Sequence, residues 1–168
     1  MNHDLVKFQL PADFVLARSL PTPGELAYGY EHGWLGPAAA VEVAAGGYGV
    51  LPDPPPAYQE LALLLPDDLA RVPDLVREIA TAGPAREDRA TIWLYLALAW
   101  LYEHRTDYPD PLSIVEQLYD DFEFPAAIEG FVRFLPAPEG QPTGEDALYA
   151  RWSAWLDTTA ARYRPVRG

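Results

Sequence analysis

The chain has 168 residues, 49% of them hydrophobic, and a domain of this size buries about two-thirds of the surface that its unfolded chain exposes. Cysteine is absent, which excludes a disulfide framework, a cysteine-ligated zinc site and thiol catalysis. Acidic residues outnumber basic ones by 25 to 12, and the formal charge of −13 repels nucleic-acid phosphates and attracts basic surfaces. We therefore expect no direct binding to DNA or RNA.

The N-terminus does not resemble a secretory signal, because it carries acids early and lacks both a basic region and a long apolar region. The longest apolar run, residues 92–102 (IWLYLALAWLY), is short compared with the roughly 20 residues that a membrane-spanning helix needs. We expect this run to form a buried helix, and we expect a cytoplasmic protein without a membrane partner.

Helices are predicted from their start and stop residues. One or two helical turns are expected within the first twenty residues. The stretch 22–25 (TPGE) then combines a capping threonine, a proline at the first helical position and a glutamate that can close a capping box. This helix should end at Gly33, and the next should run from Pro37 to Gly46 and Gly47, since glycine adopts the left-handed conformation found just past helix ends.

Residues 48–56 form a proline-rich loop, because proline lacks a backbone donor and fixes its own φ. Apolar residues recur at helical spacing beyond this loop, and Pro73 should break or kink one of the resulting helices. The predicted helices that follow the loop cover residues 58–65, 67–80, 86–105, 111–123, 126–135 and 145–163, and residues 164–168 form a flexible tail.

No segment alternates apolar and polar residues as a strand would. We predict an all-α fold in which residues 1–168 form a single compact domain of antiparallel helical hairpins packed around the central apolar helix at 86–105. Four of the five tryptophans lie in predicted helices at core-like spacing, whereas Trp34 lies between two helices and is expected at the surface. Phe131 and Phe134 could serve the core or an interface, so a homo-oligomer stays an alternative.

Acidic residues are concentrated late in the chain. Between Glu103 and Glu129 there are eight acids and one base, Arg105, which gives a net charge of −7. Asp110 and Pro111 are a good cap and a good first residue for the helix 111–123. A helical wheel puts Leu112, Val115, Leu118, Tyr119 and Phe122 on one side, and it puts Glu116, Asp120 and Glu123 on the other.

The acidic side of this helix is either a solvated face or a docking surface for a basic protein. Glu116 and Asp120 are like charges one turn apart, and acids at the end of the helix face the negative end of its dipole. Stability alone would favour lysine there, which supports docking. The predicted partner-binding residues are Glu103, Asp107, Glu116, Asp120, Asp121 and Glu123.

Catalytic motifs are missing. His3, His32 and His104 occur singly, and no two-histidine zinc motif, phosphate-binding loop or nucleophile elbow is present. We therefore predict a non-enzymatic protein that needs no cofactor and no metal. Two alternatives stay open: a small metal-dependent hydrolase that binds Mg²⁺ through Glu116 and Asp120, and a regulatory adaptor without a toxin partner.

Several segments resemble one bacterial family of unknown function, whose members recur among candidate immunity proteins of polymorphic toxin systems. The segments are DPLSIVEQLYDDFEFPAAIEGFVRFLP at 110–136, ELAYGYEHGWLGPAAAVEVA at 25–44, IWLYLALAWLYEHR at 92–105 and LYARWSAWLD at 148–157. The proline-rich loop is not part of the resemblance. The resemblance implies an inhibitor that covers the basic site of a cognate toxin, and it implies no catalytic residues.

Overall fold

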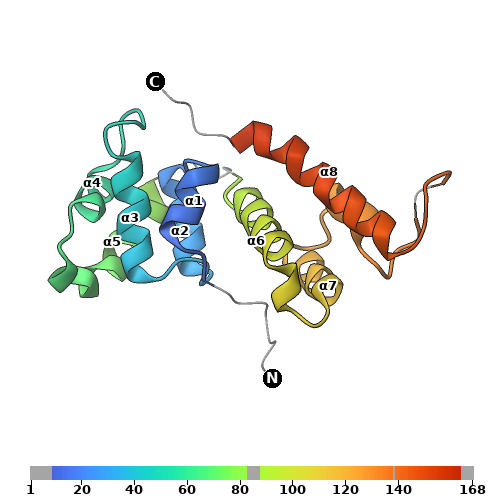
Figure 1. Cartoon of the computed structure of the whole chain (residues 1–168). Coiled ribbons are helices and arrows are strands. Elements are labelled where there is room, and N and C mark those ends of the chain that lie inside the picture. Colours follow the sequence, from blue (N-terminus) through green and yellow to red (C-terminus); the bar gives the residue numbers. More distant parts are fainter. Residues whose placement is uncertain (1–8, 83–87, 138, 164–168) are drawn as a thin grey trace. The chain divides into compact units, whose positions relative to one another are not determined.

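The computed structural model describes residues 9–82, 88–137 and 139–163 (Figure 1). Within these ranges every regular element is a helix and there is no strand, so the all-α prediction is confirmed. Contacts divide the described residues into an N-terminal unit, residues 9–93 with Tyr163, and a C-terminal unit, residues 94–162. The prediction of a single domain stays a prediction. None of the described helices is long and apolar enough to span a membrane.

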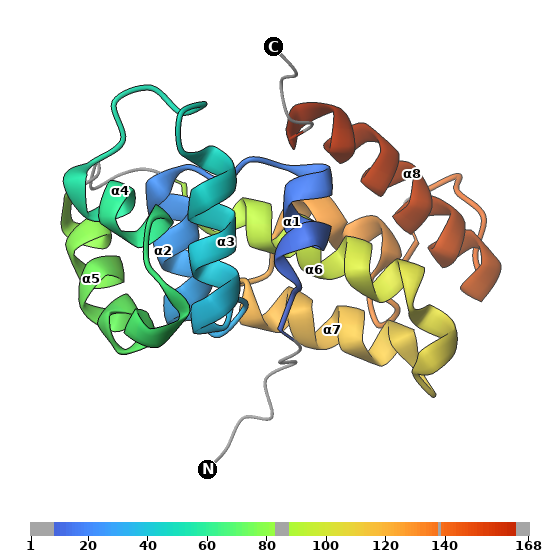
Figure 2. The ribbon, with the colours of Figure 1, turned by 60° about the vertical axis from the view of Figure 1, so that its left-hand side comes forward.

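The N-terminal unit contains five α-helices and one 3₁₀ helix, and α3 packs against α1, α2 and α4 (Figures 1 and 2). Helix α5 packs against α2 and α4. The helices are α1 (Ala12–Arg18), α2 (Pro23–Glu31), α3 (Pro37–Gly47), α4 (Pro56–Ala62), η1 (Pro66–Arg71) and α5 (Val72–Ala82). The predicted break near Pro73 is the boundary between η1 and α5, and the predicted proline-rich loop lies between α3 and α4.

The start of α2 forms the capping box expected from TPGE. The Glu25 amide donates to Thr22 Oγ1 at 3.1 Å, and the Thr22 amide donates to Glu25 Oε1 at 2.9 Å. Past the end of α2, Gly33 has the left-handed φ of 84° that its position predicts. Helix α3 ends at Gly47 as predicted, but the predicted left-handed geometry is wrong, because neither Gly46 nor Gly47 has a positive φ.

Glycine in this unit allows close approach of large side chains. A Cβ added at Gly47 would lie 2.1 Å from the hydroxyl of fully buried Tyr58, and one added at Gly29 would lie 2.1 Å from the Trp93 ring. The Trp93 indole also donates to the carbonyl of Glu25 at 2.7 Å. Trp34, expected at the surface, is only 6% exposed, because its backbone accepts from Leu10 and donates to Gly29, which holds it against the unit.

The chain passes from one unit to the other within α6 (Thr91–Glu103), between Trp93 and Leu94. This helix begins later than the predicted residue 86. Asp88 precedes it and accepts from the amides of Ala90 and Thr91, which fixes the start. Residues 86 and 87 lie outside the described part of the chain, as does the predicted tail at 164–168.

The C-terminal unit continues with η2 (Arg105–Asp107), α7 (Pro111–Asp121), η3 (Ala126–Phe131) and α8 (Glu145–Tyr163). The bounds of α8 are those predicted. The α-helix predicted at 126–135 is wrong, because a 3₁₀ helix ends at Phe131 and Val132 is extended. Gly130, near the end of this 3₁₀ helix, explains why no α-helix continues to residue 135, since glycine in a helix interior is about 1 kcal/mol less favourable than alanine.

Aromatic side chains hold α8 against α6 in this unit. The Trp152 ring lies 5.1 Å from the Tyr102 ring, and the Trp155 ring lies 6.4 Å from the Tyr95 ring. Because the later residue of α6 meets the earlier residue of α8, the two helices are antiparallel. Trp152 is fully buried and stacks on Phe131 of η3 at 6.0 Å. Trp152, one of the tryptophans predicted at core-like spacing, therefore belongs to the core of this unit.

We predict that Gly29→Ala lowers the free energy of unfolding by about 3 kcal/mol, because the added methyl group overlaps a buried ring that is also hydrogen-bonded. Urea denaturation monitored by circular dichroism measures the change. Gly130→Ala is the control, since its Cβ would lie an ordinary 3.6 Å from Arg151. Equal stability of both variants would show that Trp93 moves without cost.

Candidate functional site

Helix α7 has the two faces that its sequence predicts. Leu112, Val115 and Leu118 are fully buried or nearly so, and Tyr119 is 5% exposed, whereas Asp120 is exposed. Apolar burial therefore fixes the rotation of α7 in the C-terminal unit and turns part of its acidic side to solvent.

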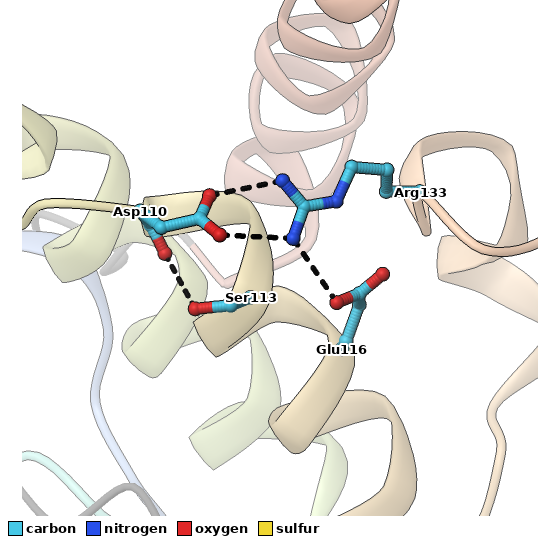
Figure 3. A network of polar contacts seen from close by, with 4 residues as sticks. All are labelled: Asp110, Ser113, Glu116 and Arg133. Atoms are coloured by element: carbon cyan, nitrogen blue, oxygen red, sulfur yellow. Dashed lines mark hydrogen bonds and ion pairs between the residues drawn. The ribbon is translucent and has the colours of Figure 1, made fainter.

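Arg133, which follows η3, binds two carboxylates at the start and middle of α7 (Figure 3). Its Nη1 and Nη2 donate to both oxygens of Asp110 at 3.0 Å and 2.9 Å. Its Nη2 also donates to Glu116 Oε1 at 3.3 Å. Asp110 and Pro111 are the cap and the first residue of α7, as predicted, but the Asp110 carboxylate binds Arg133 and forms no side-chain capping bond. The Ser113 hydroxyl donates instead to the Asp110 carbonyl at 2.7 Å.

This network removes free negative charge from the predicted docking surface. The hydrogen bonds from Arg133 lower the pKa of Asp110, and those to Asp110 and Glu116 raise the pKa of Arg133. The Glu116 side chain is only 22% exposed. Glu116 is therefore already paired within the chain. Sequence reasoning missed Arg133 because it lies just beyond the acidic stretch.

The other predicted site residues fall into two groups. Glu103, which ends α6, and Asp107 in η2 are exposed and precede α7. Asp120, Asp121 and Glu123 lie at the opposite end of α7. At a rise of 1.5 Å per residue, Asp120 is about 14 Å along the helix axis from Pro111. Asp121 is half-buried, and Asp120 and Glu123 are exposed. Within the described residues Asp107, Asp120 and Glu123 make no ion pair.

The chain leaves α7 through two consecutive left-handed residues, Glu123 at φ 62° and Phe124 at φ 60°. The Glu123 amide donates to the Asp120 carbonyl at 3.1 Å, and the Phe124 amide donates to the Tyr119 carbonyl at 2.8 Å. The chain therefore turns at Phe124. Its conformation is costly, since left-handed geometry is unfavourable for any residue with a Cβ and unusual for a bulky one.

This turn places an aromatic cluster beside the carboxylates. The Tyr119 ring meets the Phe124 ring at 5.4 Å and the Phe134 ring at 5.9 Å, and we call these three residues the Tyr119 patch. Phe124 is 58% exposed and Phe134 is 60% exposed. The Tyr119 hydroxyl donates to Glu129 at 2.8 Å, and this bond raises the pKa of Tyr119. Phe131, the other phenylalanine left open by the sequence, is buried.

Both described histidines have structural roles at helix ends. The His32 ring stacks on Tyr28 at 3.7 Å, and its Nδ1 lies 2.9 Å from the Tyr28 carbonyl. His104 repeats this arrangement on Trp100, at 3.9 Å between rings and 2.8 Å to the carbonyl. The similar stretches YGYEH and WLYEH thus form the same local structure in two helices.

Features suited to catalysis are scarce. No group of three or more His, Asp or Glu side chains that could hold a metal ion occurs in the described ranges. Tyr58, whose pKa burial raises to about 12, is completely inaccessible. A surface cavity of about 240 Å³ in the C-terminal unit is lined in part by Arg133, Glu145 and Arg151. Arg151 already donates to the carbonyls of Gly130 and Pro142.

We predict that Arg133→Met destabilises the protein at pH 7 and that the difference from the unchanged protein shrinks in acid. Because the folded pKa of Asp110 is lowered, its stabilising contribution is present above the unfolded pKa of about 4 and is lost as the pH falls through the folded value. Urea denaturation at a series of pH values measures this dependence.

Arg77→Met is the matched control, since Arg77 pairs with Asp74 through side chains that are 72% and 77% exposed. An exposed pair of this kind contributes little. Equal effects of the two substitutions, or an effect of Arg133→Met that does not shrink as the pH is lowered, would contradict the role given to Arg133.

We predict that Glu123→Gly stabilises the protein by about 0.5–1 kcal/mol. Glycine removes the left-handed strain and an acid from the negative end of α7, and these gains exceed the greater entropy of glycine in the unfolded chain. Thermal denaturation measures the change, with exposed Asp107→Gly, outside left-handed geometry, as the control. A lower melting temperature for Glu123→Gly would mean that the Glu123 side chain stabilises the turn.

Comparison with known proteins identifies one family. No curated protein and no solved structure gives a significant match. The model of a family described as "Uncharacterized protein conserved in bacteria (DUF2247)" matches residues 12–160, which is most of the chain and includes all of α7 and the Tyr119 patch. The bacterial family of unknown function expected from the sequence is thus confirmed, and the chain belongs to this family of uncharacterized bacterial proteins.

Proposed function

We propose that this chain is a non-enzymatic, acidic protein-binding module that acts as an immunity-type inhibitor by covering a basic site on a cognate toxin. The observation that carries the proposal is the end of α7, where Asp120 and Glu123 are exposed and make no ion pair within the described residues. Glu116, which forms an ion pair with Arg133, is a weaker candidate for contact with the partner.

The position of these carboxylates is unfavourable for the isolated chain. They lie at the negative end of a helix dipole, and Glu123 also has a left-handed backbone. A basic partner would convert this repulsion into attraction, and complementary charge accelerates association. A toxin that binds phosphates would present such a basic surface. The absence of cysteine fits a cytoplasmic location, which we include in the proposal.

The hydrolase alternative gains no support from the geometry. Glu116 would have to release Arg133 before it could share a Mg²⁺ ion with Asp120. The regulatory adaptor would use the same acidic surface, and only the identity of the partner separates it from an inhibitor.

Co-expression with the product of the adjacent gene tests the proposal. We expect growth rescue and a stable complex, and we expect Asp120→Lys combined with Glu123→Lys to weaken the complex at least about tenfold and to reduce its salt dependence. Titration calorimetry at low and high salt measures both effects.

The control is Asp67→Lys combined with Asp68→Lys, which changes the net charge equally at exposed acids of η1 in the other unit. Affinity should be retained in this variant. If both pairs of substitutions weaken the complex equally, only the total charge matters. If neither does, the acidic end of α7 is not the docking surface.

A further inference from the structure

The Tyr119 patch is an exposed aromatic surface that the acidic docking proposal does not by itself explain. Single exposed apolar residues are ordinary, but Phe124 and Phe134 both contact the same tyrosine. They come from two segments of the C-terminal unit, the turn after α7 and the chain after η3. Clustered exposed rings of this kind mark interaction sites, where aromatic residues are enriched.

Two observations indicate that the exposure of these rings is maintained at a cost. Phe124 has φ 60°, a conformation that glycine would adopt without strain and that is an outlier for a phenylalanine. Strained residues persist where the surrounding structure fixes them, and they concentrate at functional sites. Phe134 follows Arg133, whose bonds to Asp110 and Glu116 hold the adjoining backbone against α7.

The charges around the patch specify the kind of partner. Asp120 and Glu123 lie between Tyr119 and Phe124 in the sequence and are exposed, and Glu129 accepts a hydrogen bond from Tyr119 itself. The patch is therefore bordered by the Glu129 carboxylate, and two further exposed acids lie next to it in the chain. Its complement is a surface with an apolar side chain surrounded by lysine or arginine. A second copy of this chain fits poorly, because a two-fold symmetric contact would bring like-charged carboxylates together.

We infer that the Tyr119 patch is the anchoring point of the docking surface, and that the partner inserts an apolar side chain between Phe124 and Phe134 while its basic residues pair with Asp120, Glu123 and Glu129. This inference rests on the proposed function, since it assigns the partner chemistry of the same surface. The aromatic centre provides most of the affinity, and the carboxylates provide orientation and association rate.

The test uses three amphipathic peptides as probes. The first is built from lysine and leucine, the second from lysine and alanine, and the third from glutamate and leucine. We expect the lysine–leucine peptide to bind at least about tenfold more tightly than either of the others, measured by fluorescence anisotropy. Phe124→Ser combined with Phe134→Ser should reduce its affinity to that of the lysine–alanine peptide. Both phenylalanines are mostly exposed, so the fold should persist, and each single variant gives an independent measurement.

The control is Leu63→Ser combined with Leu65→Ser, which removes two side chains that are 63% and 65% exposed in the N-terminal unit. Its affinity for the lysine–leucine peptide should be unchanged. An equal loss in this control would mean that the peptide binds any exposed apolar residue, which would overturn the inference.

The remaining outcomes separate the two proposals. Equal binding of the lysine–leucine and lysine–alanine peptides, weakened by Asp120→Lys and Glu123→Lys, would overturn the aromatic anchor and leave the acidic docking surface. If the glutamate–leucine peptide bound as tightly as the lysine–leucine peptide, the acidic docking surface itself would be overturned. If no peptide bound, the result would count against both the aromatic anchor and the acidic docking surface. A dimer in sedimentation velocity that Phe124→Ser and Phe134→Ser convert to a monomer would assign the patch to self-association instead.

Discussion

The contact between Arg133 and the carboxylates of Asp110 and Glu116 is the interaction on which the candidate site depends (Figure 3). It joins the segment after η3 to α7 in the C-terminal unit. It also places Asp110 and Glu116 in ion pairs, whereas Asp120 and Glu123 make no ion pair within the described residues. Because Phe134 is the next residue, the same contact helps to place one ring of the Tyr119 patch.

This arrangement gives the two ends of α7 different character. At the start, an arginine neutralises the acids, and Pro111 and Leu112 are buried, so this part is structural. At the end, exposed acids, a left-handed turn and the exposed ring of Phe124 occur within six residues, from Tyr119 to Phe124. Local stability would favour glycine in the turn and lysine at the helix end. The sequence departs from both preferences at one place, and the docking proposal rests on this departure.

Comparison of the sequence with the structure shows where local patterns are sufficient. The capping box at Thr22 and the extent of α8 follow from residues close together in the chain, and both are present. Gly47 ends α3 as the sequence predicts, but the close packing of Leu16 against Gly46 and of Tyr58 against Gly47 depends on other helices and does not follow from the local pattern. Trp34 was misassigned for a similar reason, since its backbone bonds to Leu10 and Gly29 are invisible to local patterns. The segment 126–135, predicted to be a helix throughout, buries Ile128 and Phe131 but forms only a 3₁₀ helix that ends at Phe131.

The sequence by itself determined the all-α class, the amphipathic division of α7 and the concentration of acids between Glu103 and Glu129, because each depends on composition or on a period of 3.6 residues. Only the tertiary structure decided which of those acids are unpaired and which phenylalanines are exposed. Arg133 is seventeen residues from Glu116, and Phe134 is fifteen from Tyr119, so neither contact follows from helical periodicity. Chain folding brings these residues together, and it thereby pairs Asp110 and Glu116 with Arg133 while Asp120 and Glu123 stay exposed.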